Sequence, residues 1–194
     1  MRFFKPSLMF LMMLIICFSI ASESAYPRSP VDLDHDIFNY VHKDMNNKFL
    51  DKATPKIQLM GDPRGYFGVC LLLCAFGNEK MFETGKLASA GYLETGFIAF
   101  VLKETIRRPR PLSEDEKDSF PSGHSAFAFT LATIASHEYP KFSVPLYLMA
   151  AGTGFSRVYL GRHYPSDVLV GAVIGVLVGM EINHYGEPIL KFSF

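Results

Sequence analysis

The sequence predicts an all-α protein: a multi-pass transmembrane bundle of five to six helices, with an amphipathic helix near its N-terminus. Two observations support this fold class. The first is that hydrophobic residues make up 49% of the 194 residues, which is at the upper edge for a soluble domain. These residues gather in apolar runs at about 65–77, 87–102, 125–136, 143–155 and 168–180.

The second observation comes from the last apolar run. Gly171, Gly175 and Gly179 repeat at every fourth position, a spacing that lets two helices approach closely in lipid. Each run is nevertheless shorter than the ~20 residues that a spanning helix needs. The mean hydropathy of +0.17 is also low for a membrane-buried chain. A soluble helical bundle is therefore the alternative fold.

Residues 1–25 are predicted to be a signal peptide or an N-terminal anchor. Arg2 and Lys5 give the chain a basic start, residues 7–20 are apolar, and residues 21–25 include small residues suited to cleavage. The apolar stretch is short for a span, which favours the signal peptide. The rest of the chain, residues 26–194, is predicted to form a single domain.

Residues 31–56 are predicted to form one amphipathic helix that lies on the membrane or packs on the bundle. Charged residues are interspersed here with apolar residues at helical spacing. The apolar positions are Ile37, Phe38, Val41, Met45, Phe49 and Leu50.

Three short motifs in the second half of the chain contain residue types that bind a phosphoryl group. Lys103 and Arg110 stand in the pattern K-x6-R-P, P-S-G-H occupies 121–124, and S-R-x5-H-x3-D occupies 156–167. An arginine pairs two phosphate oxygens with its planar fork, whereas a lysine supplies a compact charge. Lys103, Arg110 and Arg157 are therefore candidate phosphate ligands.

The second motif precedes an apolar run and is predicted to begin a helix. Ser122 stands near the helix N-cap, where free backbone N–H groups and the helix dipole bind anions. Gly123 permits close approach of a ligand to the backbone. His124 is predicted to lie in the first helical turn, facing the same phosphate.

The third motif indicates a histidine nucleophile. His163 and Asp167 are four residues apart, so they are predicted to share a helix face. The carboxylate is expected to accept the Nδ1 proton of His163 and to leave Nε2 free to attack. His124 has no evident acidic partner in the sequence, and we predict that it is the general acid for the leaving oxygen.

These residues resemble the three-part signature of the type 2 phosphatidic acid phosphatase superfamily. This family includes membrane lipid phosphatases, soluble bacterial acid phosphatases and vanadium-dependent haloperoxidases. All eleven identities of the signature are present in order, and the similarity is densest over 103–186. The resemblance implies that His163 forms a phosphohistidine, that Asp167 supports it and that His124 is the acid.

The resemblance also implies which residues bind the phosphate and that no cofactor takes part. The implied phosphate ligands are Lys103, Arg110, Ser122, Gly123 and Arg157. The family hydrolyses phosphate esters without a metal, and no Cys, His or carboxylate spacing in this chain demands one.

The parity of the predicted spans places all three motifs on one side of the membrane. If the five runs span, the motifs lie on the side reached by an exported N-terminus. The turns at 77–83 and 137–141 then lie on the other side. The acidic stretch 113–118 is predicted to be a solvated connector, too short for a cap domain, so the site is expected to accept a bulky substrate.

The sequence therefore predicts a membrane phosphatase that hydrolyses a lipid phosphate or pyrophosphate through a phosphohistidine. We expect it in the inner membrane of a bacterium, with the active site facing the periplasm. Undecaprenyl pyrophosphate, phosphatidylglycerophosphate, phosphatidic acid and lipid A all remain open as substrates. The alternatives are a soluble periplasmic acid phosphatase of broad specificity, a vanadate-bound haloperoxidase, and a non-catalytic transport or scaffold protein.

The expected partners follow from the same residues. The motifs imply a lipid phosphate substrate and the membrane itself. The formal net charge is zero, so nothing indicates a nucleic acid, and no obligate protein partner is evident from the sequence.

Overall fold

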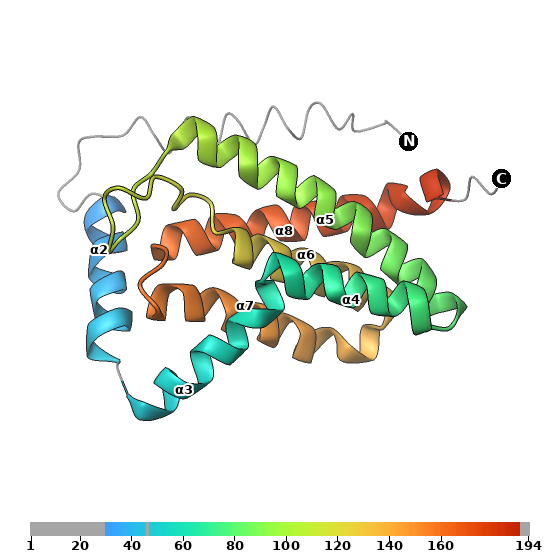
Figure 1. The fold of residues 1–194 in the computed structure, drawn as a ribbon, viewed down its shortest axis with the longest axis horizontal. Helices are drawn as coiled ribbons and strands as arrows, with labels where there is room; N and C mark the ends of the chain where they lie inside the picture. Colours follow the sequence, from blue (N-terminus) through green and yellow to red (C-terminus); the bar gives the residue numbers. More distant parts are fainter. Residues whose placement is uncertain (1–29, 46, 191–194) are drawn as a thin grey trace. The chain divides into compact units, whose positions relative to one another are not determined.

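The computed structural model describes residues 30–45 and 47–190, and the predicted signal peptide or anchor lies outside them. The chain divides into two compact units, residues 1–33 and 34–194. The arrangement below concerns the second unit. Its helices, with α2 beginning in the first unit, are α2 (Pro30–Asn39), α3 (Lys48–Ile57), α4 (Pro63–Phe76), α5 (Glu79–Ile106), α6 (Gly123–Glu138), α7 (Ser143–Tyr159) and α8 (Pro165–Leu190) (Figure 1).

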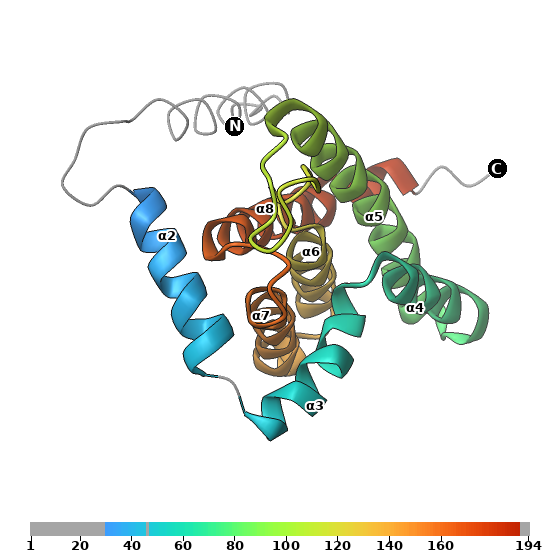
Figure 2. The same cartoon turned by 60° about the vertical axis from the view of Figure 1, so that its left-hand side comes forward.

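The helices α4 to α8 coincide with the five predicted apolar runs, and α6 is their centre. It packs against α4, α5, α7 and α8 (Figure 2). Several of its side chains are small and buried: Ala126, Ala128 and Ala132 are each at most 5% exposed. Small side chains let the neighbouring helices approach from several directions. The all-α fold class is therefore confirmed for the described residues.

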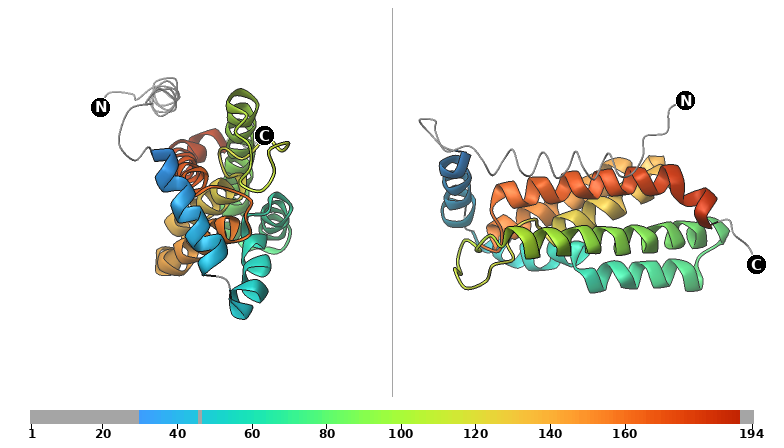
Figure 3. Two further views of the ribbon diagram at one scale, coloured as in Figure 1. Left: turned by 90° about the vertical axis from the view of Figure 1, so that its left-hand side faces the viewer. Right: turned by 90° about the horizontal axis from the view of Figure 1, so that it is seen from above.

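The glycine repeat forms the contact between α8 and α6, which run side by side (Figure 3). A Cβ atom on Gly171 would lie 2.5 Å from the backbone oxygen of Ser122. One on Gly175 would collide with the backbone oxygen of Ala126, and one on Gly179 would lie 2.5 Å from the Cβ of Thr133. The two backbones thus meet directly, and the predicted close packing of this run is confirmed.

The prediction of a single amphipathic helix over 31–56 is wrong. The segment forms two helices, α2 and α3, separated by a π-helical turn at Tyr40–Asp44. Asn47 has an extended backbone, and its side-chain oxygen accepts bonds from the N–H groups of Phe49 and Leu50, each at 3.0 Å. These bonds satisfy donors that begin a new helix, so local capping interrupts the helical periodicity.

Large apolar side chains are exposed on the outer faces of four helices, which indicates an apolar surrounding or partner. They include Leu71, Leu72 and Phe76 on α4, Leu93, Phe97 and Phe100 on α5, Val144 and Leu148 on α7, and Leu169, Val173 and Met180 on α8. By length and composition, one helix of the described part, Pro165–Gly186 within α8, is able to cross a membrane. The number of five to six spans stays a prediction.

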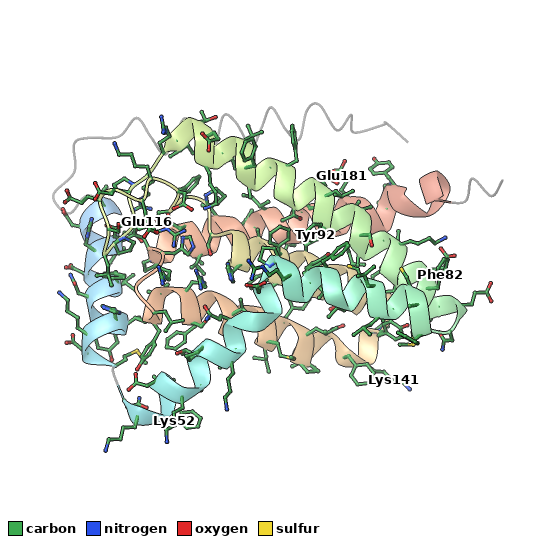
Figure 4. The ribbon with its side chains drawn as sticks, viewed as in Figure 1. Lys52, Phe82, Tyr92, Glu116, Lys141 and Glu181 are labelled. Atoms are coloured by element: carbon green, nitrogen blue, oxygen red, sulfur yellow. The ribbon has the colours of Figure 1, made fainter. Side chains whose placement is uncertain are left out.

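The connector between α5 and α6 lies at the opposite end of the helices from the α4–α5 and α6–α7 turns. Figure 4 shows Glu116 of this connector at one end, whereas Phe82 and Lys141 lie at the other. The first motif runs from the end of α5 into the connector, the second lies at the start of α6, and the third runs from the end of α7 to the start of α8. They therefore gather at the end that Glu116 marks.

Candidate active site

The start of α6 is built from the P-S-G-H motif as predicted. Ser122 is the N-cap residue, but its side chain makes no capping bond. Its buried Oγ has no hydrogen-bond partner among the described residues. A Cβ atom on Gly123 would meet nothing within 4 Å. A buried hydroxyl without a partner, beside open space at a helix start, fits a site for an anion.

His163 lies in the loop between α7 and α8, and only 2% of it is exposed. Its Nδ1 is 2.7 Å from the backbone oxygen of Ser119. A carbonyl oxygen only accepts hydrogen bonds, so Nδ1 carries the proton and Nε2 keeps its lone pair. The ring is therefore held in the tautomer that a nucleophilic Nε2 requires.

The expectation that His163 and Asp167 share a helix face is wrong. α8 begins only at Pro165, because the residue before a proline is disfavoured in the α conformation and the helix cannot extend back through it. The Asp167 carboxylate lies 3.9 Å from Nδ1 of His163, too far for a hydrogen bond. Nδ1 instead donates its hydrogen bond to the backbone oxygen of Ser119.

Asp167 forms hydrogen bonds with residues next to His163 rather than with the imidazole ring. Its Oδ2 accepts bonds from the Ser119 hydroxyl at 2.6 Å and from the Tyr164 N–H at 2.9 Å. Ser119 supplies the carbonyl that orients His163, and Tyr164 is the next residue in the chain. The carboxylate therefore positions the histidine through the backbone on both sides of it.

Arg108 is a residue of this site that the sequence analysis did not identify. Its guanidinium donates to Asp167 at 2.7 Å, to Ser166 at 2.7 Å and to Asp34 at 2.7 Å. It forms ion pairs with two carboxylates that are almost completely buried. In the sequence, Arg108 is only the second residue of the doublet Arg107-Arg108, which precedes Pro109. The two carboxylates that it binds lie 59 and 74 positions away.

Two of the three predicted phosphate-binding cations bind the same residue, Asp118, in this structure. Arg110 forms a fork with it, with Nε–Oδ1 and Nη2–Oδ2 distances of 2.7 and 2.8 Å. The Lys103 ammonium donates to its backbone oxygen. The Arg110 guanidinium holds the pKa of the Asp118 carboxyl below its usual range. The acidic stretch 113–118 is therefore not simply a solvated connector, because part of it occupies the fork that a phosphate needs.

Arg157 is the third cation, and it is only 8% exposed. It donates from Nη1 to Gln58, while its buried Nε has no partner among the described residues. Burial, and then the charges of Arg110 and Arg162, lower the pKa of Arg157 to about 10. A buried guanidinium with an unused donor gains stability from an anion.

The same field favours the neutral form of both histidines. Burial, followed by the charge of Arg157, lowers the pKa of His163 to about 2. The same two causes lower the pKa of His124, which precedes the apolar run at 125–136, to about 4. A phosphate dianion would offset these positive charges.

A cavity of about 490 Å³ opens beside these residues. Arg110, His124 and Arg157 line it, so it exposes three of the predicted site residues. Asp62, Gln58 and Arg162 line it as well, although none of the three motifs specifies these residues. His163 and Asp167 are not among the lining residues and lie buried, at 2% and 0% exposure. The structure thus brings the three motifs together around one polar pocket.

Comparison with known proteins identifies a family and several relatives. Residues 86–188 match the PAP2 superfamily. The undecaprenyl-diphosphatase BcrC of Bacillus subtilis is 32% identical over 172 residues, which cover 82% of this chain and 88% of that protein. A lipid A 1-phosphatase of Porphyromonas gingivalis is 50% identical over 72 residues, 35% of this chain but only 16% of that protein.

A crystal structure shows the same fold. The transmembrane PAP2 type phosphatidylglycerolphosphate phosphatase from Bacillus subtilis superposes with a TM-score of 0.76 at 26% sequence identity. The match covers 98% of this chain and 100% of that one.

Proposed function

Because the chain belongs to the PAP2 superfamily, we propose that it is a metal-independent membrane phosphatase acting on a lipid phosphate or pyrophosphate. Relatives named for lipid A, undecaprenyl diphosphate and phosphatidylglycerolphosphate support a lipid substrate. The exposed apolar faces of α4, α5, α7 and α8 support a location in the membrane. The substrate's phosphate enters the cavity while its tail stays in lipid.

In the first chemical step, Nε2 of His163 attacks the phosphorus atom. A nitrogen–phosphorus bond forms, and the bond from phosphorus to the leaving oxygen breaks. His124 gives its proton to that oxygen and becomes neutral. Ser119 and Asp167 keep the His163 ring in place, because Nδ1 keeps its proton and donates a hydrogen bond to the Ser119 carbonyl.

In the second step, water hydrolyses the phosphohistidine. Neutral His124 takes a proton from the water as its oxygen attacks phosphorus, and the nitrogen–phosphorus bond breaks. The electron pair returns to Nε2 of His163, and inorganic phosphate leaves. Both histidines are then back in their starting protonation states, so the cycle needs no other acid or base.

The cations stabilise the charge that builds up on the phosphoryl oxygens. Arg157 offers its unused Nε, and Ser122 and Gly123 offer the start of α6. Arg110 must exchange the Asp118 carboxylate for phosphate before it takes part. One observation carries the proposal: Nε2 of a buried histidine is left free by a bond from Nδ1 to a carbonyl, in the field of three cations.

The purified protein in detergent is expected to release phosphate from one or more lipids in the presence of EDTA. The physical reason is that Lys103, Arg110 and Arg157 supply the charge that a metal would otherwise provide. The panel comprises undecaprenyl pyrophosphate, phosphatidylglycerophosphate, phosphatidic acid and lipid A. Orthovanadate should inhibit the reaction. Loss of activity with EDTA and its recovery with Mg²⁺ would contradict the metal-free mechanism.

The proposed orientation places the site on the periplasmic side of the inner membrane. In a background without Cys17, Cys70 and Cys74, Glu114→Cys is expected to react with a membrane-impermeant maleimide in intact spheroplasts. Glu79→Cys should react only after lysis, because it begins α5 at the other end of the helices. These two acidic residues are both exposed and so form a matched pair. The reverse pattern would place the site in the cytoplasm, and labelling of both would contradict a membrane-spanning bundle.

A further inference from the structure

Asp62 faces His124 from the start of α4, and its two carboxylate oxygens have different neighbours. Oδ1 accepts a hydrogen bond from the Arg64 N–H at 2.8 Å, which makes Asp62 the N-cap of α4. Oδ2 lies 3.8 Å from Nε2 of His124. The cap thus fixes the side chain in a rotamer that directs its second oxygen toward the imidazole.

The distance between Asp62 and His124 suits an interaction between charges. At 3.8 Å it is too long for a hydrogen bond, so the carboxylate does not accept a hydrogen bond from Nε2. The proton on Nε2 remains available to a leaving oxygen in the cavity, which both residues line. A negative charge at this distance still favours the protonated imidazole.

His124 needs such a neighbour if it is to be an acid. Charged groups act on it from four surrounding segments, and three of these groups are cations that oppose protonation. The fourth is Asp62, whose charge raises the pKa of His124 against the effects of burial and the cations. The cations are Arg157 on α7, Arg110 in the α5–α6 connector and Lys103 on α5.

We propose that Asp62 is a positioning residue that favours the protonated form of His124 in its role as the general acid. The inference rests on the proposed function. Asp62 takes no part in the proton transfer: the proton passes from Nε2 of His124 to the leaving oxygen and returns from the attacking water. The dianionic phosphoryl group adds further negative charge near the ring, so His124 becomes a competent acid when the substrate is bound.

The substitution Asp62→Asn separates this role from helix capping. Asparagine caps helices about as well as aspartate, so α4 keeps its N-cap while the negative charge is lost. Activity requires protonated His124 and falls as pH rises through the pKa of that residue. Removing the charge lowers this pKa in the substrate complex, so the basic limb of the kcat profile should move to lower pH by about one unit.

The experiment uses the full chain in detergent with a lipid from the panel that the wild type hydrolyses. Asp115→Asn is the matched control, because it removes the same charge from an exposed position on the α5–α6 connector. Its profile should coincide with that of the wild type. Asp62→Ser also keeps a capping side chain and should reproduce the shift of Asp62→Asn.

A second measurement keeps the inference separate from the proposed function. The ¹⁵N NMR titration of His124, assigned with His124→Gln, should give a lower pKa in Asp62→Asn than in the wild type. If the wild type released no phosphate from any lipid, the proposed function would fail, and this titration would still decide the effect of Asp62. An unchanged pKa of His124, or an unchanged basic limb in an active Asp62→Asn enzyme, would overturn the inference.

Discussion

Replacing His163 with alanine is expected to lower kcat/KM by ~10³-fold or more, because positioning alone does not replace a nucleophile. Rapid quenching of the wild type with a ³²P-labelled lipid phosphate should trap phosphate on the protein. The adduct should be labile in acid and stable in base, as expected for a phosphohistidine. The alanine variant should carry no label.

His163→Ala also removes the donor to the Ser119 carbonyl, and a buried acceptor left without a partner costs about 1–3 kcal/mol of folding stability. His163→Asn separates this effect from catalysis, because its amide places a donor near the position of Nδ1. It should retain the wild-type Tm and still be inactive. His137→Ala is the matched control, since that histidine is exposed at the far end of α6. Label on either His163 variant would refute the phosphohistidine.

Arg157→Lys is expected to lower kcat/KM at least ~10-fold, which corresponds to about 1.4 kcal/mol of transition-state stabilisation. Lysine keeps the charge but loses the planar fork, and with it the Nε donor that has no partner among the described residues. Because that donor is expected to serve the transition state, inhibition by orthovanadate should weaken in parallel.

The control for Arg157→Lys is Arg64→Lys, made at an exposed position in the first turn of α4. It makes the same chemical change without altering the cavity lining, and its activity should match the wild type. Wild-type kcat/KM and vanadate affinity in Arg157→Lys would remove Arg157 from the phosphate site.

The helices of the bundle could be predicted because apolar runs carry their own periodicity. The runs at 87–102 and 168–180 coincide with α5 and α8, although both helices extend beyond them through polar residues. The break in the amphipathic segment 31–56 could not be predicted from the same pattern. Its break depends on two hydrogen bonds to the side chain of Asn47, and apolar spacing does not record such bonds.

The types and order of the motif residues predict a candidate site, but several of the contacts that these residues make could not be predicted. His163 and Asp167 are close in sequence, so a local interaction between them was expected. Each instead bonds to Ser119, which lies 44 and 48 positions away. Arg108 and Asp62 were missed for the same reason, because their charged partners come from other segments.

The glycine contact between α8 and α6 also gives the site its dimensions. The backbone N–H of Ser122 donates to the backbone oxygen of Asp167 at 3.0 Å, one helical turn before the point where Gly171 meets the Ser122 carbonyl. Main-chain atoms therefore set the distance between the start of α6, the proposed anion site, and the segment that carries the proposed nucleophile His163. Substitutions of side chains in the pocket are therefore expected to leave this spacing unchanged, because main-chain atoms set it.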